Sequence, residues 1–356
     1  MSITVSTADP SEQDTWDQYV ERSPQGTVFH RYGALESMRN HSGGTLYPLI
    51  GYKGQEPVGI FPIFELNSGP VTLVFSPPYE LGIPTLGPAL LNMGKLKQRK
   101  REKRHARFVE SCLEWIDDEI DPHYTYVETD WNYDDTRPFV WNDFDVSPAY
   151  TYVLPLGDRP SEEELIGRFS SSPRRRIRDH LDEEYTVEIG GRDAIEWIVD
   201  RVTERYEEQD RTPHFTVDFA LELSERLPDG AVRPYLLSIN GEPVTGCLIL
   251  EHDGTAHRWQ GGAIPDTDFP ANEVLEWHMM LDAIDRGIDT YELVGANTPR
   301  LNTWKAKFSP EIRTYYSAKR SSTSMDIAES LYLNLRDKSS LLTSLAPSTE
   351  SASKGK

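Results

Sequence analysis

The chain has 356 residues, with 58 Asp or Glu against 37 Lys or Arg, which give a formal net charge of −21 at pH 7. Hydrophobic residues make up 37% of the sequence and aromatic residues 10%, so the composition supplies folded cores and excludes a disordered chain. Eleven of the basic residues are Lys, and an acidic, Lys-poor surface is favoured where high salt screens charge repulsion, so we expect a halophilic, archaeal source.

The N-terminal residues 1–13 have neither the basic start nor the apolar stretch of a signal peptide. No run approaches the roughly 18 apolar residues that a membrane span needs. We therefore expect a cytoplasmic protein. Cys112 and Cys247 lie in apolar runs far apart, and we expect two buried thiols rather than a disulfide framework.

The first half of the chain alternates helical and extended patterns. Its expected elements are helices at 11–22 and 31–41, a hairpin at 47–66, a strand at 70–76, a helix with apolar residues at spacing four from Phe108 to Ile120, and a strand at 123–130.

A basic segment, "KLKQRKREKRHAR" (95–107), begins the third of these helices and contains eight Lys or Arg in thirteen positions. The basic residues point all round a helix axis, so the segment projects from the body or lies against an anionic partner. Nucleic acid or another polyanion, a tRNA among the candidates, would contact Lys97, Lys100, Arg101 and Arg104. The alternative is a solvated helix paired with the acidic surface.

The second half repeats the order of the first. A strand at 148–157 and a helix from Ser161 to Phe169 lead into it. Its expected elements are helices at 192–209 and 215–227, a hairpin at 233–254, a strand at 255–263, a helix at 271–287 and a strand at 289–295. Both hairpins carry Glu-Pro-Val after the turn, at 56–58 and 242–244. The repeat predicts two tandem domains, 1–150 and 151–320, each a mixed β-sheet flanked by helices, and a helix with a disordered tail at 321–356.

Arginines gather in "SSSPRRRIRDH" (170–180), just after a Pro that favours a helix start. Cations there oppose the helix dipole, so a function other than helix stability is indicated. Guanidinium groups suit phosphate oxygens, which makes Arg175, Arg176 and Arg178 candidate substrate ligands. The alternative is ion pairing with the acidic residues that follow.

Lys305 is the first candidate for chemistry, because the chain has no Lys between Arg104 and Trp304. We expect an exposed ammonium that steadies a phosphate or a developing negative charge on a carbonyl oxygen, the alternative being a solvated lysine. Glu292 ends a predicted strand, where it would accept a proton from an amine or be an ordinary surface acid. Asn297 follows in the next turn and is a candidate substrate ligand.

No signature of covalent or metal catalysis is present. The sequence has no Gly-x-Ser-x-Gly, no His-Glu-x-x-His and no Cys-x-x-Cys. We therefore expect direct transfer between two bound substrates, with no metal and no permanently bound cofactor.

The order of elements resembles the GNAT (N-acyltransferase) fold, and its duplication resembles the Fem-type peptidyltransferases and their acetyltransferase-like relatives. Three segments are similar to that family, at 23–38, 164–190 and 275–309. The last includes aromatic-Lys-x-x-Phe at 304–308. The chain has Val294 and Ser309 at two positions where the family commonly has Gly.

The resemblance implies two tandem GNAT-like domains and transfer of an acyl or aminoacyl group to the amine of a sugar- or peptide-linked, phosphate-bearing acceptor. It implies a donor that is either aminoacyl-tRNA or acyl-CoA. It also places Trp259 and Gln260 where a GNAT strand diverges from its neighbour and presents backbone N–H groups to substrate.

Two other hypotheses stay open. One is an acyl-CoA-dependent N-acetyltransferase of surface glycan synthesis. The other is a non-catalytic tandem GNAT protein that binds RNA or another anion through residues 95–107.

Overall fold

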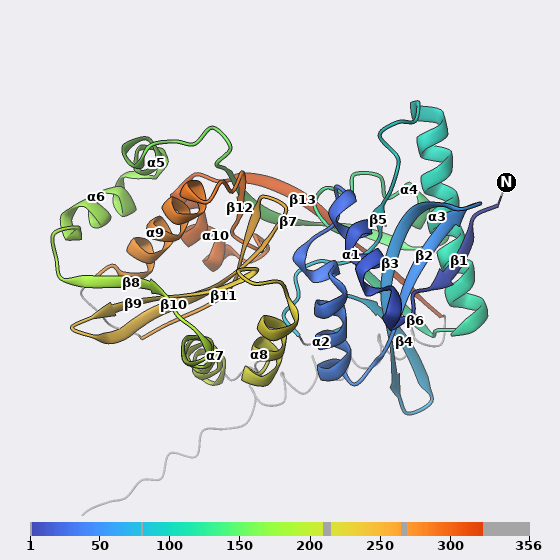
Figure 1. The fold of residues 1–356 in the computed structure, drawn as a ribbon, viewed down its shortest axis with the longest axis horizontal. Helices are drawn as coiled ribbons and strands as arrows, with labels where there is room; N and C mark the ends of the chain where they lie inside the picture. The colour runs from blue at the N-terminus through green and yellow to red at the C-terminus, as the bar shows by residue number, and fades with distance from the viewer. Residues whose placement is uncertain (1, 80, 209–214, 265–268, 323–356) are drawn as a thin grey trace, which may run out of the picture.

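Figure 1 shows the computed structural model of the chain, which describes residues 2–79, 81–208, 215–264 and 269–322. The first half contains, in chain order, β1 (Thr4–Thr7), α1 (Gln13–Arg22), α2 (Tyr32–Ser42), β2 (Thr45–Lys53), β3 (Glu56–Ser68), β4 (Val71–Ser76), β5 (Ala89–Leu90), α3 (Gln98–Glu119), β6 (Tyr124–Glu128), α4 (Arg137–Val140) and β7 (Asp145–Pro155).

The second half contains α5 (Glu162–Arg168), α6 (Ser171–His180), β8 (Tyr185–Ile189), α7 (Arg192–Glu207), α8 (Val217–Arg226), β9 (Val232–Ile239), β10 (Glu242–His252), β11 (Thr255–Ala263), α9 (Ala271–Asp285), β12 (Thr290–Glu292), α10 (Pro299–Lys305) and β13 (Glu311–Ser321). The capping box predicted at Ser161 is present, with Glu164 as its partner.

The strands of the described residues form one mixed sheet in the order β1-β2-β3-β4-β6-β13-β7-β12-β11-β10-β9-β8, with β5 paired to β3. The order is nearly symmetric about its centre. The hairpin β2–β3 lies second and third from one edge, and the hairpin β9–β10 lies second and third from the other. The parallel pair β4–β6 corresponds to the parallel pair β11–β12. The predicted fold class, mixed β-sheet flanked by helices with the same order of elements in both halves, is confirmed.

The two hairpins share a local irregularity as well as a position. In the first, Tyr52 pairs with Pro57 and Gly51 with Gly59, which leaves Val58 as a bulge. In the second, the pairing passes from Pro243 to Thr245 and leaves Val244 as a bulge. The repeated Glu-Pro-Val therefore marks the same bulged strand start in both halves.

The two central strands are exchanged between the halves. β7 follows the first half in sequence but pairs with β12, and β13 follows the second half but pairs with β6. The two strands also pair with each other from Glu311–Val153 to Lys319–Asp145. The predicted boundary at residue 150 falls inside β7, and the division into 1–150 and 151–320 stays a prediction.

Helices cover both faces of the sheet (Figure 1). α1, α2, α7 and α8 share one hydrophobic core that draws on both halves, including Phe29, Leu35, Ile198 and Phe219. α3 covers the opposite face of the first half, and α5, α6 and α9 cover that face of the second half. α2 and α8 meet where the halves join, and His41 lies 2.8 Å from a carboxylate oxygen of Glu222.

Four strands, β1, β5, β8 and β13, were missed from the sequence, and β5 has only two residues. β1 and β8 are the edge strands; β8 does alternate Tyr185, Val187 and Ile189 with polar residues, but both strands have at most five residues and are mostly exposed. β13 shows no period of two, because its two buried residues, Tyr315 and Ala318, lie three positions apart. The predicted helix and tail lie almost wholly in 323–356, outside the described residues.

Candidate active site

Lys305 ends α10 and is buried, with 5% of the residue exposed. Its ammonium donates hydrogen bonds to the backbone carbonyls of Val294 and Gly295, the latter at 2.8 Å. The expectation that Lys305 is exposed was wrong, because α10 packs its last turn over the loop that follows β12. An ammonium has three N–H donors, and no third acceptor lies among the described residues, so one donor stays available to a substrate.

Burial lowers the pKa of Lys305 to about 8, and the positive charge of Arg258 contributes to the same shift. The ammonium therefore loses its proton within the physiological range rather than well above it. A lysine in this state can both stabilise a negative charge and release a proton.

The loop that holds Lys305 has an unusual backbone. Val294 and Gly295 both have positive φ angles, of 46° and 81°. This left-handed pair turns two successive carbonyl groups towards the ammonium. Ser309, which caps the turn after α10, also has a positive φ, of 57°. The two positions where the chain departs from the Gly of the resembled family are thus positions where Gly would be unstrained.

Glu292 is the last residue of β12 and is buried. One of its carboxylate oxygens accepts a hydrogen bond from the Thr151 hydroxyl at 2.7 Å, and the other lies 2.6 Å from His257 Nδ1. The interpretation as a surface acid is therefore wrong. Both oxygens are engaged, and the carboxylate fixes the His257 ring, whose Nε2 has no partner among the described residues.

Asp130 lies beside this pair. It is buried at the loop after β6 and accepts a hydrogen bond from Asn132 N at 2.8 Å. Burial, with the negative charge of Glu292, raises the pKa of Asp130 to about 7. Glu128 ends β6, and burial raises its pKa to about 7 as well. Both carboxylates were missed, although the internal repeat carries a signal, because Glu128 and Glu292 end equivalent strands.

Asn297 and Tyr315 close the site towards β13. Asn297 Oδ1 accepts a hydrogen bond from Tyr150 N at 2.8 Å, and its amide nitrogen donates to the Tyr315 hydroxyl at 3.0 Å. Burial, and then the charges of Glu128 and Glu292, raise the pKa of Tyr315 to about 12. Asn297 therefore has structural partners on both sides, and its predicted role towards substrate stays a prediction.

β11 and β12 diverge at this point. Their parallel pairing ends at His257 and Glu292, whereas β11 continues to Ala263 against β10. The Trp259 side chain packs into the core shared by the halves and donates to Gly82 O at 2.7 Å. Gln260 also lies close to Gly82. The predicted divergence of the strands is present, and both side chains contact the first half.

The arginines of α6 have mixed surroundings. Arg176 pairs with Glu273 at 2.9 Å, and Arg178 pairs with Glu163. Lys307 also reaches Glu273, at 3.6 Å, which links α6 to the end of α10. Arg175 is exposed and has no partner among the described residues. Phosphate binding by these arginines stays a prediction, with Arg175 the side chain most available for it.

The basic residues of α3 lie elsewhere. α3 packs on the outer part of the first half, away from α10 (Figure 1). Arg104 pairs with Glu56 at 3.2 Å, whereas Lys97, Lys100 and Arg101 have no partner in the part of the chain that the structure describes. Any polyanion they bind therefore contacts a surface separate from Lys305.

Residues 169–306 match a family model described as an acetyltransferase (GNAT) domain. This range includes Arg175, Trp259, Glu292 and Lys305 but covers less than half of the chain. No curated protein matches the sequence.

Several solved structures share the fold over most of the chain. The crystal structure of FemX is 12% identical, covers 88% of this chain and 96% of its own, and has a TM-score of 0.68. L-PGS from Bacillus licheniformis is 12% identical, with coverages of 92% and 97% and a TM-score of 0.56. A tandem GNAT protein from the clavulanic acid biosynthesis pathway is 11% identical, with coverages of 90% and 98% and a TM-score of 0.51. At these identities the likeness establishes the fold.

None of the helices in the described residues has the length and apolar character needed to cross a membrane. Within the same residues, no three His, Cys, Asp or Glu side chains are grouped so as to hold a metal ion. The halophilic, archaeal source and the cytoplasmic location stay predictions.

Proposed function

We propose that the protein is an acyltransferase that moves an acyl or aminoacyl group onto an amine. The observation that carries the proposal is the divergence of β11 and β12 beyond His257 and Glu292, with the Lys305 ammonium bound to the loop that follows. Diverging strands leave backbone groups for an acyl donor, and the match of residues 169–306 to an acetyltransferase (GNAT) domain supports this use.

In the proposed reaction the nitrogen of a neutral amine attacks the carbonyl carbon of the donor. A C–N bond forms, and the C–S bond of a thioester or the C–O bond of an ester breaks. The free N–H donor of Lys305 stabilises the negative charge on the carbonyl oxygen or on the leaving group, which then takes up a proton.

The proton released by the amine goes to His257 Nε2 in this mechanism. Glu292 holds the ring through Nδ1, and Thr151 holds Glu292, so the three side chains form a chain of hydrogen bonds that ends at a base. Glu292 then positions the base rather than accepting the proton itself. The negative charge of Glu292 also acts on Lys305, which supports one shared site.

The donor is acyl-CoA or aminoacyl-tRNA, and the acceptor is a small or glycan-linked amine that carries phosphate. Exposed Arg175 supports a phosphate-bearing acceptor, because α6 contacts the turn that ends α10. FemX and L-PGS are among the proteins of similar fold, which makes aminoacyl transfer a candidate reaction beside acetyl transfer.

Incubation of the purified protein in molar KCl with [14C]acetyl-CoA, or with [14C]aminoacyl-tRNA, tests the proposal. Each donor is combined with a panel of amino sugars, amino-sugar phosphates and short peptides. We expect label in an acceptor with one donor, lost in Lys305→Ala. Native mass spectrometry of the same sample reads bound CoA or tRNA directly. Absence of transfer from both donors, with RNA bound, would favour the non-catalytic alternative.

A further inference from the structure

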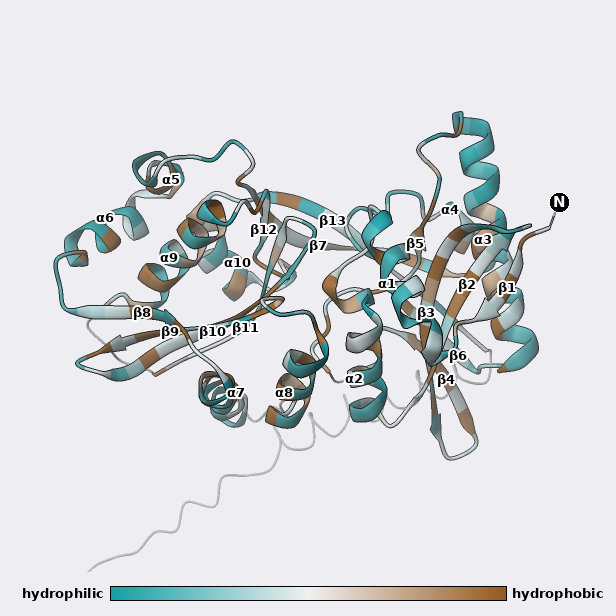
Figure 2. Cartoon of the chain, in the orientation of Figure 1, coloured by the Kyte–Doolittle hydropathy of each residue, from teal (hydrophilic) through white to brown (hydrophobic). Residues whose placement is uncertain are grey.

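Five cations of the basic segment have no ion-pair partner in the described residues: Lys97, Arg99, Lys100, Arg101 and Lys103. All five are exposed. Lys95 and Arg104 differ from them because both pair with Glu56. Figure 2 shows these first turns of α3 as a hydrophilic stretch that extends beyond the sheet. We call these five residues the basic cluster.

The basic cluster destabilises its own helix. The first turn of α3 has no acidic residue, and the N-cap residue Lys97 forms no side-chain capping hydrogen bond. The cations therefore repel the positive end of the helix dipole and one another, and Glu102 is the one acidic residue between Lys97 and Arg104. In a chain of net charge −21, acidic residues would relieve this repulsion, so helix stability does not explain the composition of these turns.

Two exposed apolar side chains lie beside the basic cluster. Val140 and Trp141, at the end of α4, are 53% and 61% exposed. α4 packs against α3, and the Arg137 guanidinium lies over the Trp141 ring at 5.5 Å. Val140 and Trp141 are consecutive residues, and neighbouring exposed apolar side chains with a polar rim are typical of an interaction site.

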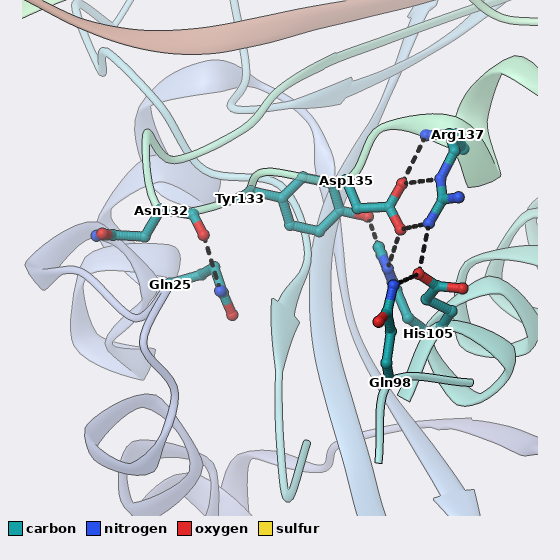
Figure 3. A network of polar contacts seen from close by, with 8 residues as sticks. Gln25, Gln98, His105, Asn132, Tyr133, Asp135 and Arg137 are labelled. Atoms are coloured by element: carbon teal, nitrogen blue, oxygen red, sulfur yellow. Dashed lines mark hydrogen bonds and ion pairs between the residues drawn. The ribbon is translucent and has the colours of Figure 1, made fainter. Parts of the chain in front are cut away.

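A polar network fixes these apolar side chains to the first turns of α3 (Figure 3). Arg137 binds Asp135 with two hydrogen bonds of 2.8 Å and reaches Glu102 of α3 at 3.3 Å. Gln98 also donates to Glu102, and His105 lies 3.7 Å from Asp135. Strong pairing with Arg137 lowers the pKa of Asp135 below its usual range. The network holds α4 rigidly at the level of the basic cluster.

We propose that the basic cluster, with Val140 and Trp141, docks the protein on an anionic lipid membrane. Cations bind the phosphate headgroups, and the Trp ring and the Val side chain enter the interfacial layer, where amphipathic aromatic rings are favoured. A nucleic acid would satisfy the cations but offers no apolar environment for Val140. The proposal is independent of the proposed acyl transfer.

The charge of the remaining chain determines the orientation. The chain as a whole carries a net charge of −21, so an anionic membrane repels the molecule except where cations gather. Binding through this one surface therefore fixes which side of the molecule faces the lipid. Because each cation contributes about a fivefold factor to binding at low salt, the affinity falls steeply as salt screens the attraction.

Co-sedimentation of the full chain with lipid vesicles tests the proposal. Vesicles of phosphatidylcholine alone are compared with vesicles containing 30% phosphatidylglycerol, at 0.1 M and 1 M KCl, with circular dichroism confirming that the protein is folded. We expect binding to the anionic vesicles at 0.1 M KCl and little binding in the other three conditions.

Two triple variants that remove the same number of positive charges distinguish binding through the basic cluster from attraction by the overall charge. Replacing Lys97, Lys100 and Lys103 with Gln should weaken binding about a hundredfold. Replacing Arg39, Arg192 and Arg226 with Gln, on α2, α7 and α8, should leave it unchanged. Trp141→Ala should weaken binding severalfold with no change of charge, a loss that pure electrostatics does not produce.

Three outcomes would overturn the proposal. The first is no binding to anionic vesicles by the folded protein at 0.1 M KCl. The second is equal loss in the two triple variants. The third concerns total tRNA, whose binding is measured by gel shift at the same salt. If tRNA binding depends on the three Lys residues and vesicle binding does not, the surface binds nucleic acid.

Discussion

A single buried ammonium distinguishes this site from the rest of the acidic surface. Lys305 is held by two backbone carbonyls and lies within the electrostatic reach of Glu292. It therefore contributes to folding as well as to the proposed chemistry, and substitutions at this position need two measurements.

Lys305→Ala should lower turnover by about two to three orders of magnitude, the usual loss of one electrostatic stabiliser. It should also lower the free energy of unfolding by about 1–3 kcal/mol, because the carbonyls of Val294 and Gly295 lose their donor. Urea denaturation and the labelled-acceptor assay measure the two effects. Lys307→Ala is the matched control, since its longer 3.6 Å contact with Glu273 is half-exposed. Equal losses in both variants would assign the effect to the whole segment.

Turnover should fall as the pH rises through about 8, where Lys305 loses its proton. The sign follows from the role of the charge: the ammonium, not the neutral amine, stabilises the developing negative charge. Lys305→Arg should remove this decline because a guanidinium stays charged, although its planar shape should leave the rate low. A pH–rate profile of both forms between pH 6 and 9.5 provides the measurement. An unchanged alkaline decline in Lys305→Arg would contradict the assignment.

His257→Ala should lower turnover by a factor of about 10²–10⁴, the contribution of a general base. Glu292→Gln keeps a hydrogen-bond acceptor for the ring but removes the charge, so its loss should be smaller. His278→Phe is the control, since His278 lies on α9 and contacts Tyr185. If His257→Ala and the control have the same activity, another group accepts the proton.

At the scale of elements, the loop after β12 and the turn after α10 carry the strain in the site. A β-branched side chain at positive φ costs roughly 1–2 kcal/mol, so Val294→Gly should raise the free energy of unfolding by about 1 kcal/mol after the entropy cost of Gly. Val187→Gly, in strand β8, should lower it instead. Thermal melts of the two variants make the comparison, and destabilisation by both would mean that Val294 packs more than it strains.

The sequence predicts these elements unevenly. Both hairpins could be located because Glu-Pro-Val follows a turn in each half. Lys305 could be singled out as a site residue because lysine is scarce in this chain. The edge strands β1 and β8 could not, because each has at most five residues and most of these are exposed. Asp130 and His257 could not be placed beside Glu292 either, since three separate elements bring them together and only strand pairing fixes that contact.

At the scale of the whole molecule, the halves are joined by exchanged strands and by one shared core. β13 completes the first half of the sheet and β7 the second, and the core around Phe29 and Phe219 includes helices of both. We therefore expect that the boundary placed by the sequence repeat does not mark an independent unit of stability.

We expect the chain to unfold in one cooperative transition. Neither half can keep its sheet once the strand from the other half leaves, so partial unfolding exposes the hydrophobic core of both. Differential scanning calorimetry in molar KCl should give equal calorimetric and van't Hoff enthalpies. Two resolved transitions, or a folded fragment 1–150 expressed alone, would show that the exchange contributes little.

The exchange also has a consequence for synthesis on the ribosome. Residues 1–128 supply every strand of the first half of the sheet except β13, which emerges almost two hundred residues later. Until then β6 is an open edge in a nascent chain, and open edges pair readily with other chains. The N-terminal half must therefore wait, partly folded, until nearly the whole described chain has been translated, which makes it a natural client for a chaperone that shields strand edges.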